Sequence, residues 1–400
     1  MSRARLARTL VLVAAASVAL GACAARTEQP SGNDSGTAAQ GPQQPADAAD
    51  PKGDGKAVCS GVTIAYAGTI NGNSAALGQN ILYGVDLAVK QHNQNNPNCQ
   101  VQMKQFDTEG KPDRAPGIAT QIINEPAILG VVGLPFSGES KAVGNLFNQA
   151  GLVTVTPSAT NPALSKNGWK TFFRGMGNDA TQGPAAAKML TETLKANKVC
   201  VIEDDSEYGI GLAAQVRDAL KEKASCSDKV KTAQTDFSAV VNKISSESPD
   251  AVFYSGYYPE AGPLAQQLDD KGVTAKFVGP DGVKDDEFVK GAGNAAANAV
   301  FTCPCVPAEQ FTGFSSAYKQ VEGRDPGTYS PEGYDLTTIL LKGIDKGIKD
   351  RAGLLEFVRT YEGQGLTKKF EWDATGELTD TPVWSYKVEN GKIVSAGRIN

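Results

Sequence analysis

Short apolar runs alternate with amphipathic segments of helix length from residue 62 onward. The run at 62–66 predicts a strand, and apolar residues at helical spacing over 77–94 predict the helix after it. The same pattern predicts strands at 101–106, 128–132, 152–156, 199–202, 230–233, 251–254 and 276–278, and helices at 113–125, 138–149, 180–196, 209–223, 236–247 and 260–271. Strands that alternate with helices indicate parallel sheets covered on both faces. A second series starts after Arg174, so we expect an α/β fold of two doubly wound lobes.

The C-terminal part departs from this alternation. Residues 310–361 have the pattern of helices, while 369–372 and 383–388 have the pattern of strands. A tail that adds to both lobes crosses between them more than once and forms a hinge of several crossovers. We expect lobe 1 to comprise residues 58–177 plus 304–378, and lobe 2 to comprise residues 178–303 plus 379–400.

The first residues have the order of an export signal. Three arginines precede the apolar run 10–20, which is too short for an ordinary membrane-spanning helix. The sequence Leu20-Gly21-Ala22-Cys23 resembles a bacterial lipobox, in which the cysteine is diacylated and becomes the first mature residue. Two acyl chains, at about 0.8 kcal/mol per buried methylene, anchor a protein stably. We expect a signal peptide at 1–22 and lipidation at Cys23; the alternative is a plain signal peptide with an incidental cysteine.

Residues 24–57 contain no Val, Ile, Leu, Met, Phe, Trp, Tyr or Cys. Such a segment cannot bury enough apolar surface to offset the entropy lost when a chain is ordered. We therefore expect residues 23–57 to be the lipidated cysteine and a disordered tether, which as a flexible coil spans roughly 30 Å. The tether would hold a folded body near the membrane and leave it free to reorient.

Charge and composition argue against nucleic-acid binding and against catalysis. The 39 basic and 44 acidic residues give a net charge of −5, which leaves little attraction for phosphates. His92 is the one histidine, which argues against multi-histidine metal sites and Ser-His-Asp triads. Residues 133–138 superficially resemble a nucleophile elbow, but Pro135 stands where the elbow needs glycine. With no dinucleotide or Walker A motif either, we expect a binding protein without cofactor or metal.

Six cysteines remain once Cys23 is set aside, an even number that an oxidising compartment can pair. Cys59 and Cys99 each directly precede a predicted strand, at its N-terminal end, so they would lie close together if those strands pair side by side. Cys200 and Cys226 flank one strand–helix unit in the same way. The last two are separated by a single proline, so a bridge there would close a small ring. A redox or zinc site would need a CxxC spacing or histidines. We expect the pairs Cys59–Cys99, Cys200–Cys226 and Cys303–Cys305.

Polar residues follow directly after several predicted strands, where open α/β sheets bind their ligands. Ser137 lies in the loop after strand 128–132, at the start of a helix whose free N–H groups attract a carboxylate. The alternative is a plain N-cap serine. The turn at 156–162 follows the next strand and exposes backbone groups and hydroxyls, although an isolated turn of this kind is as often structural.

The second series supplies polar residues at the same kind of position. These residues are Tyr208, Tyr257 and Asp281, each after a predicted strand. Asp281 stands between a proline and a glycine at a strand end, where it can receive a ligand ammonium group; the alternative is a solvated turn aspartate. The site therefore depends on all five junctions facing one cleft.

These segments together resemble the substrate-binding proteins of branched-chain amino acid ABC transporters, the Leu/Ile/Val-binding family with a type I periplasmic-binding fold. The resemblance covers residues 58–400. It is carried by Ala75–Gly78, the loop around Ser137, Thr156–Leu164, Phe173-Arg174, Asp205–Gly209, Gly256-Tyr257, Gly279–Val283 and Phe370–Gly376. Each segment is short, but their order and spacing are specific.

The resemblance implies a site for a zwitterionic amino acid. The residues at Ser137 and Thr160 hold the α-carboxylate in that family, and the backbone carbonyl at Ser158, beside Ala159, helps receive the α-ammonium. Asp281 completes the ammonium site from the opposite lobe. The family also implies that Tyr208 and Tyr257 close over the ligand and that Leu77 and Tyr329 line its side-chain pocket.

This sequence departs from the family pattern at three positions. Asp281 replaces a longer glutamate, so the ammonium group would be held differently. Leu77 stands where an aromatic residue is common, which bears on the size of the pocket. Phe136, and not a cysteine, precedes Ser137, so the first disulfide is relocated.

We expect a monomeric, exported solute-binding protein, lipid-anchored on the outer face of the cell membrane. It would capture an amino acid, branched-chain or otherwise aliphatic, and deliver it to ABC transporter permease subunits. Because the two ends of the ligand bind different lobes, the ligand favours the closed state. The alternatives are an amide, a γ-amino acid or an aromatic acid on the same scaffold, or a ligand-sensing surface lipoprotein without transport.

Overall fold

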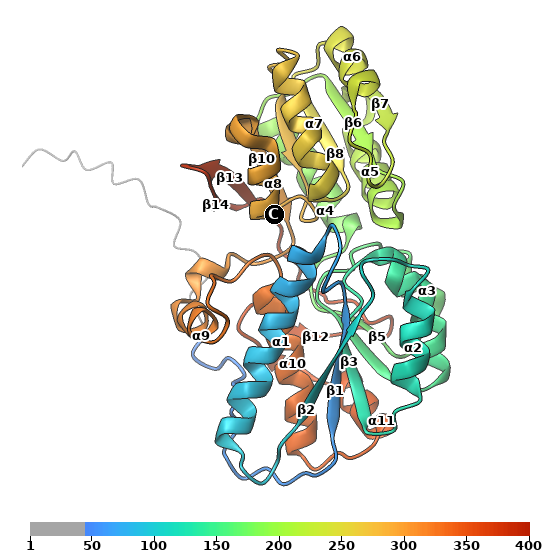
Figure 1. Cartoon of the computed structure of the whole chain (residues 1–400), viewed down its shortest axis with the longest axis vertical. Coiled ribbons are helices and arrows are strands. Elements are labelled where there is room, and N and C mark those ends of the chain that lie inside the picture. The colour runs from blue at the N-terminus through green and yellow to red at the C-terminus, as the bar shows by residue number, and fades with distance from the viewer. Residues whose placement is uncertain (1–44) are drawn as a thin grey trace, which may run out of the picture. The chain divides into compact units, whose positions relative to one another are not determined.

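The computed structural model describes residues 45–400, which form two α/β lobes, each built on its own sheet (Figure 1). The predicted fold class is confirmed. Lobe 1 has a five-stranded parallel sheet in the order β2 (Gln102–Asp107), β1 (Thr63–Gly68), β3 (Ile128–Gly133), β4 (Val153–Thr156) and β5 (Phe172–Arg174). Its helices are α1 (Ala75–Asn95), α2 (Ala115–Ile123), α3 (Ser137–Gln149), α9 (Thr312–Glu322), α10 (Ser330–Asp345) and α11 (Arg351–Arg359).

Lobe 2 is built on a seven-stranded mixed sheet. Its order is β14 (Lys392–Arg398), β13 (Trp384–Glu389), β10 (Ala299–Cys303), β9 (Lys276–Gly279), β8 (Ala251–Ser255), β6 (Val199–Glu203) and β7 (Ala224–Lys229), and β13 is antiparallel to both of its neighbours. Its helices are α4 (Asp179–Lys188), α5 (Glu207–Leu220), α6 (Ser238–Glu247), α7 (Tyr258–Asp270) and α8 (Asp286–Ala292). A short hairpin pairs β11 (Glu362–Gln364) with β12 (Lys369–Glu371).

Alternate side chains of the central strands enter cores on opposite faces, as the period of two along a strand requires. In β1, Ile64 and Tyr66 pack with apolar residues of α1 and α10, while Ala65 and Ala67 pack with residues of α2 and α3. The strand β6 divides its side chains in the same way between α4–α5 and α6–α7. Helices therefore cover both faces of each sheet, which buries the central strands and explains their nearly continuous apolar sequences.

Three segments connect the lobes. The chain leaves lobe 1 after β5, returns to it after β10 and enters lobe 2 again between β12 and β13. Residues 175–178, 304–307 and 372–383 make these connections. In both lobes, the loops at the carboxyl ends of the parallel strands face the other lobe. These loops carry the polar residues noted in the sequence.

The predicted strand at 230–233 is wrong. The structure has β7 at Ala224–Lys229, at the edge of the sheet, where it pairs with β6 alone. Its side chains alternate between intermediate and exposed, so the strand carries polar residues that do not show a buried pattern. The predicted helix 180–196 is α-helical only to Lys188 and continues as a π-helical turn, Met189–Thr193.

Residues 45–57, which the sequence assigns to the tether, lie against lobe 1. The N–H of Ala49 donates to the carbonyl of Gln364 at 2.8 Å, and the side-chain amides of Asn95 and Asn96 donate to the carbonyl of Lys52 at 3.0 and 2.9 Å. The prediction of a disordered tether therefore fails for these residues, because hydrogen bonds and the burial of Pro51 and Ala57 hold them against the lobe. The signal peptide and Cys23 lie outside the described residues.

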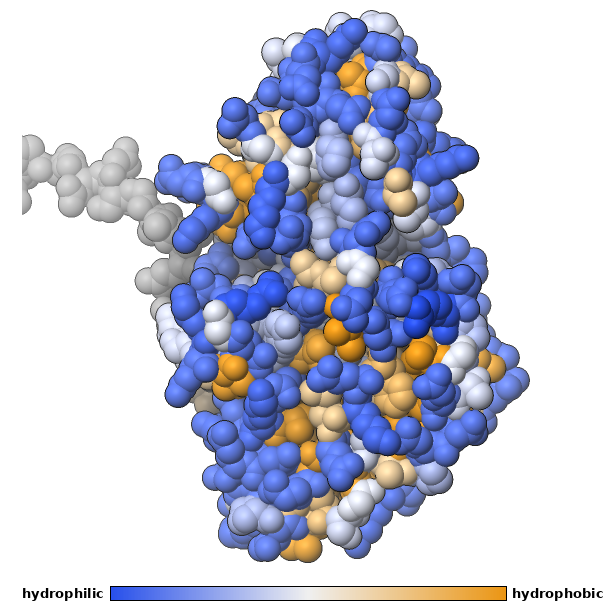
Figure 2. Space-filling view, viewed as in Figure 1, coloured by the Kyte–Doolittle hydropathy of each residue, from blue (hydrophilic) through white to orange (hydrophobic). Residues whose placement is uncertain are grey.

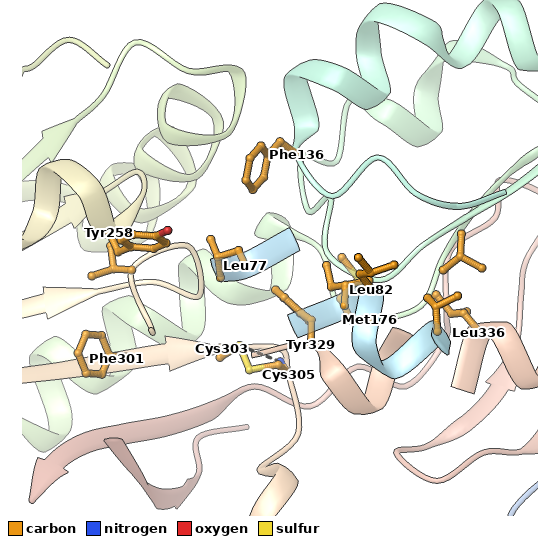
Figure 3. Close-up of a cluster of buried hydrophobic side chains, with 14 of the residues drawn as sticks. Leu77, Leu82, Phe136, Met176, Tyr258, Phe301, Cys303, Cys305, Tyr329 and Leu336 are labelled. Atoms are coloured by element: carbon orange, nitrogen blue, oxygen red, sulfur yellow. Dashed lines mark hydrogen bonds between the residues drawn. A yellow bond between two sulfur atoms is a disulfide. The ribbon is translucent and has the colours of Figure 1, made fainter. Parts of the chain in front are cut away.

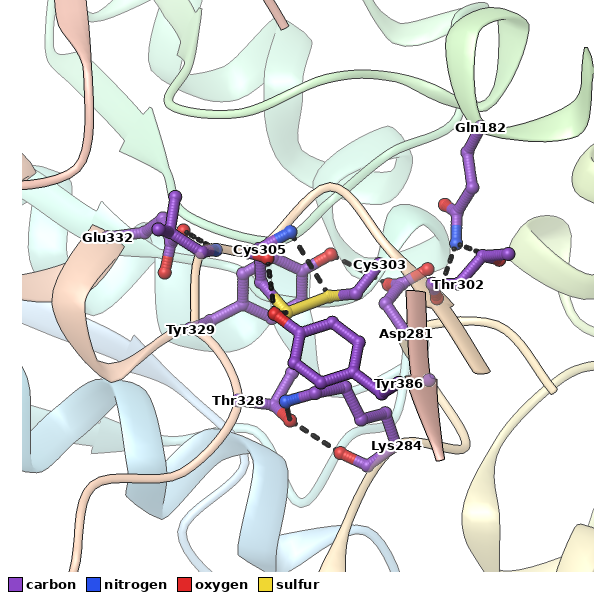
Figure 4. Close-up of a disulfide and its surroundings, with 12 residues drawn as sticks. Gln182, Asp281, Lys284, Thr302, Cys303, Cys305, Thr328, Tyr329, Glu332 and Tyr386 are labelled. Carbon is purple, nitrogen blue, oxygen red and sulfur yellow. Dashed lines mark hydrogen bonds between the residues drawn. A yellow bond between two sulfur atoms is a disulfide. The ribbon is translucent and has the colours of Figure 1, made fainter. Parts of the chain in front are cut away.

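The six cysteines beyond Cys23 lie in the three predicted pairs. The Cα atoms are 4.4 Å apart for Cys59–Cys99, 4.5 Å for Cys200–Cys226 and 5.0 Å for Cys303–Cys305. The last pair lies beside Tyr386, whose hydroxyl donates to the carbonyl of Cys305 at 2.8 Å (Figure 4). Formation of these disulfides in an exported protein stays a prediction.

The surface is mostly hydrophilic on the face drawn in Figure 2. Among residues 45–400, the large hydrophobic side chains that are exposed are Val58, before β1, Ile210 in α5 and Val321 in α9. Within the same residues, no helix is long and apolar enough to cross a membrane.

Candidate functional site

One cavity brings most of the predicted ligand-binding residues together. Its space, counting the open mouth, is about 290 Å³, and little of this space is wide enough to admit a water molecule, so the side chains nearly fill the site. Its lining consists of Leu77, Pro135, Phe136, Ser137, Ser158, Tyr208, Tyr257, Asp281, Gly282 and Tyr329. These residues come from the loops after β3, β4, β6, β8 and β9 and from the starts of α1 and α10. Both lobes therefore contribute to a single site.

Ser137 is the first residue of α3 and does not cap it. The N-cap is Phe136, which has no side-chain acceptor, and the carboxylate of Glu139 accepts the N–H of Phe136 at 3.3 Å. The hydroxyl of Ser137 accepts the N–H of Asn161 at 3.2 Å, which ties the two loops of lobe 1 together. Because no side chain caps α3, N–H groups of its first turn are available to an anion in the cavity.

The loop after β4 contributes Ser158 to the lining, whereas Ala159 and Thr160 are buried outside it. The reason lies in Arg174, a fully buried side chain whose guanidinium donates to the carbonyls of Ala159 and Asn161, the latter at 3.0 Å. These hydrogen bonds fix the backbone on either side of Thr160. The hydroxyl oxygen of Thr160 is buried without a hydrogen-bond partner, so its role in holding a carboxylate stays a prediction.

Asp281 is the acidic group of the lining, and tyrosines from both lobes hold it. The hydroxyl of Tyr208 donates to one carboxylate oxygen at 2.7 Å. The hydroxyl of Tyr329 donates to the other at 2.8 Å, as Figure 4 shows. Burial raises the pKa of Asp281, although the two hydroxyl donors oppose the shift. Burying a carboxylate without a cation is costly, so a cation that approaches Asp281 stabilises its ionised form.

A second acid, Asp179, is one that the sequence reasoning missed. It lies in the first turn of α4, directly after a connection between the lobes, and both of its oxygens are buried without hydrogen-bond partners. Burial, together with the negative charge of Asp281, raises the pKa of Asp179 to about 8. The sequence does not distinguish Asp179 from an ordinary acidic residue at the start of a helix. The residues that surround its side chain come together only in the folded hinge.

An aromatic wall crosses from one lobe to the other. The rings of Phe136 and Tyr257 have centroids 4.7 Å apart, and those of Tyr257 and Tyr208 have centroids 5.2 Å apart. Leu77 and Tyr329 come from α1 and from the start of α10, and Figure 3 shows them with Phe136 around the same space. In the sequence, Phe136 is noted only because it replaces a cysteine of the family pattern. Its position next to Ser137 could have identified it as a residue of the site.

Side chains of metal-binding type meet once in the described part of the chain, away from this cavity. His92, Cys99 and Asp345 lie together at the base of lobe 1. The Nε2 atom of His92 is 2.7 Å from a carboxylate oxygen of Asp345, and the sulfur of Cys99 is paired with Cys59. Each of these groups already has a protein partner, so the cluster serves the structure and does not suit a metal.

A two-lobed α/β fold with a small polar-and-apolar cavity between its sheets defines the class of solute-binding proteins. The profile of the family described as "Periplasmic binding protein" matches residues 61–392. The chain therefore belongs to the periplasmic binding protein family. This family assignment confirms the resemblance noted in the sequence and the prediction of a binding protein rather than an enzyme.

The chain is similar to several amino-acid-binding proteins. The leucine-, isoleucine-, valine-, threonine-, and alanine-binding protein of Pseudomonas aeruginosa is 28% identical over 326 residues, which cover 79% of this chain and 87% of that protein. The leucine-specific-binding protein of Salmonella typhimurium is 31% identical over 253 residues, 62% of this chain and 68% of that protein. A branched-chain amino acid transporter substrate binding protein from Streptococcus pneumoniae, solved with isoleucine, superposes with a TM-score of 0.79 at 26% identity and covers 84% of this chain and 99% of that one.

Proposed function

We propose that this protein captures an amino acid between its two lobes and delivers it to an ABC permease. The proposal includes export and a lipid anchor at Cys23 on the outer face of the cell membrane, which the signal sequence and the lipobox-like residues support. The family assignment and the names of the relatives support the solute class. The contacts of the cavity supply the physical argument.

The carboxylate of the ligand binds on the side of lobe 1. The first turn of α3 has no side-chain cap at its N-terminus, and the helix dipole adds positive potential there. The hydroxyl of Ser137 lies in the same turn and lines the cavity. A carboxylate at this place would accept charge-assisted hydrogen bonds, each worth about 1.5–3 kcal/mol.

The ammonium group of the ligand binds on the side of lobe 2. Asp281 is a buried carboxylate in the lining, and Asp179 is a second buried acid close enough for the two to affect each other's ionisation. A buried carboxylate is unfavourable when it is ionised without a cation beside it, and an ammonium group next to Asp281 relieves that cost. The site therefore favours a zwitterion over a simple carboxylic acid.

The side chain of the ligand lies against apolar groups. Leu77, Phe136 and Tyr257 line the cavity, and their apolar surfaces suit an aliphatic side chain better than a polar one. The relatives named above bind leucine, isoleucine and valine, among others. We therefore propose a branched-chain or other aliphatic amino acid as the ligand.

One observation carries the proposal: the uncapped start of α3 in lobe 1 and the buried carboxylate of Asp281 in lobe 2 line the same cavity. Isothermal titration calorimetry with L-leucine, leucinamide and 4-methylpentanoate tests it, because the two analogues each lack one charged end. We expect L-leucine, or another aliphatic amino acid from a panel, to bind at least tenfold more tightly than either matching analogue. Equal affinity for the analogues would reject the zwitterion site.

A second candidate is an aromatic acid on the same scaffold. The wall of Phe136, Tyr257 and Tyr208 favours it, since these rings can stack on a planar ligand. An aromatic acid would need Asp281 to be protonated, and burial raises the pKa of Asp281 in that direction. Benzoate in the same calorimetric panel separates the two candidates: its binding in the absence of amino-acid binding would favour the aromatic acid.

The anchor can be tested separately from the ligand. We expect the protein expressed in a bacterium that processes lipoproteins to incorporate labelled palmitate and to partition into detergent. The Cys23→Ala variant should lose both properties while ligand binding is unchanged. A wild-type protein that stays unlabelled and is secreted would indicate a plain signal peptide.

A further inference from the structure

The start of α1 in lobe 1 has no cap of its own, and a residue of lobe 2 supplies one. The N-cap residue Ser74 makes no side-chain hydrogen bond to the helix. The hydroxyl of Tyr258, the first residue of α7, accepts the N–H of Ala76 at 3.3 Å and donates to the carbonyl of Asn73 at 2.7 Å. The hydroxyl of Tyr258 in lobe 2 therefore pairs with two backbone groups of lobe 1. These are the N–H of Ala76, in the first turn of α1, and the carbonyl of Asn73, which precedes the helix.

Tyr258 is connected to the candidate ligand site on both of its sides. Its backbone N–H donates to the carbonyl of Gly282 at 3.0 Å, next to Asp281. On the side of lobe 1, Leu77 follows Ala76 directly and lines the cavity. The side chain of Tyr258 is 6% exposed and does not line the cavity itself. Figure 3 shows Tyr258 and Leu77 in one cluster of buried side chains.

We propose that Tyr258 is a positioning residue for ligand capture: its hydroxyl caps α1 only when the lobes are together, and so favours the closed arrangement. This inference rests on the proposed function. In the open arrangement, water satisfies the N–H of Ala76 and the carbonyl of Asn73. In the closed arrangement these groups lose that water, and Tyr258 replaces it. Removing the hydroxyl therefore penalises the closed state more than the open one.

The test compares two variants that each remove one tyrosine hydroxyl. Tyr258→Phe keeps the buried ring and loses the contact between the lobes. Tyr334→Phe is the matched control, because the hydroxyl of Tyr334 donates to Gln91 at 2.7 Å within lobe 1. We expect Tyr258→Phe to weaken binding of the amino acid about three- to tenfold, through faster dissociation at an unchanged association rate. The control should bind like the wild type.

Hydrogen exchange gives a second readout, measured with and without saturating amino acid so that the closed arrangement is populated in one of the two samples. We expect the amide of Ala76 to exchange at least about threefold faster in Tyr258→Phe than in the wild type and in Tyr334→Phe. Wild-type affinity in Tyr258→Phe overturns the positioning role, and unchanged exchange at Ala76 overturns the cap. If the wild type binds no amino acid while the exchange difference is present, the cap stands and the proposed function is rejected.

Discussion

Asp281 connects the two lobes at the candidate site, because its carboxylate accepts a hydroxyl from each of them. We predict that Asp281→Asn weakens amino-acid binding at least tenfold, or about 1.4 kcal/mol. The amide has nearly the same shape but lacks the negative charge that an ammonium group requires. Calorimetric titration measures the loss, and circular dichroism shows that the fold is retained.

A suitable control for Asp281→Asn is Asp286→Asn, which removes an exposed charge in the first turn of α8, five residues away. This control should bind like the wild type, since exposed charges outside the cavity contribute little. If both variants lose the same affinity, the effect of Asp281 comes from net charge and not from a direct contact with the ligand.

Asp179 gives a prediction about pH. Its pKa is raised from 3.8 to about 8 by burial first and by the charge of Asp281 second. Between these values the folded protein holds a proton on Asp179 that the unfolded chain has released. The free energy of unfolding of the ligand-free protein therefore falls as the pH rises from about 4 to about 8, by at most about 1.4 kcal/mol per pH unit from this group.

Urea denaturation at pH 5 and pH 8 measures this effect. We expect the Asp179→Asn variant, which has no titrating group at this position, to lose part of the difference in stability between the two pH values. Asp286→Asn should retain the wild-type difference. A wild-type pH dependence in Asp179→Asn would mean that the buried carboxyl is ionised throughout this range.

At the scale of elements, the placement of α1 depends on the absence of a side chain at Gly78. A Cβ atom there would lie 1.8 Å from the carbonyl oxygen of Thr69, and the carbonyl of Gly78 accepts the hydroxyl of Tyr66 at 2.7 Å. We predict that Gly78→Ala lowers the free energy of unfolding by about 1–3 kcal/mol or more, because the backbone must move. Thermal denaturation followed by circular dichroism measures the change.

Gly117→Ala is the control for the helix itself. Gly117 lies in α2, and no heavy atom lies within 4 Å of a Cβ added there. Alanine is a better helix former than glycine by about 0.5–1 kcal/mol, so this variant should be neutral or more stable. A destabilised Gly117→Ala alongside a stable Gly78→Ala would contradict the close approach of α1 and Thr69.

Most strands with two neighbours in a sheet are predicted well from the sequence, although β10 is missed and the edge strand β2 is found. Strands such as β3 and β8 are buried on both faces, so an unbroken apolar run marks them. The edge strand β7 contacts one neighbour and carries serine, aspartate and lysine, and the apolar residues at 230–233 lie just beyond it. The strand β7 is held in the sheet by backbone hydrogen bonds to its one neighbour, and such bonds do not require a pattern of apolar residues.

The candidate site was predictable to the same extent. Parallel strands direct their carboxyl ends to one side, so the junctions at Ser137, Ser158, Tyr208, Tyr257 and Asp281 meet without any knowledge of the packing. The position of Thr160 was not predictable in this way, because it depends on Arg174. The guanidinium of Arg174 pairs with Glu377 at 3.0 Å and orients the loop from behind, and neither residue is near the loop in sequence.

At the scale of the whole molecule, the contacts between the lobes differ in kind. Lys141 and Glu207 form an ion pair of 2.9 Å across the lobes, with side-chain exposures of 58% and 32%. Solvent and salt screen such a pair, so we predict that Lys141→Ala changes the dissociation constant of the ligand by less than about twofold. A change of tenfold or more by calorimetry would indicate that this pair controls closure.

Closure itself is the property that couples the two halves of the site to transport. A ligand whose carboxylate contacts α3 and whose ammonium contacts Asp281 gains both interactions only when the lobes are together, so it shifts the population toward the closed arrangement. We predict that saturating ligand lowers the radius of gyration of the wild-type protein in solution X-ray scattering. The same ligand concentration should leave Asp281→Asn more open, because the ligand then binds one lobe without the other. Scattering curves of the wild type that are identical with and without bound ligand would show that the lobes do not respond to the ligand, and a permease would then have no change of shape to recognise.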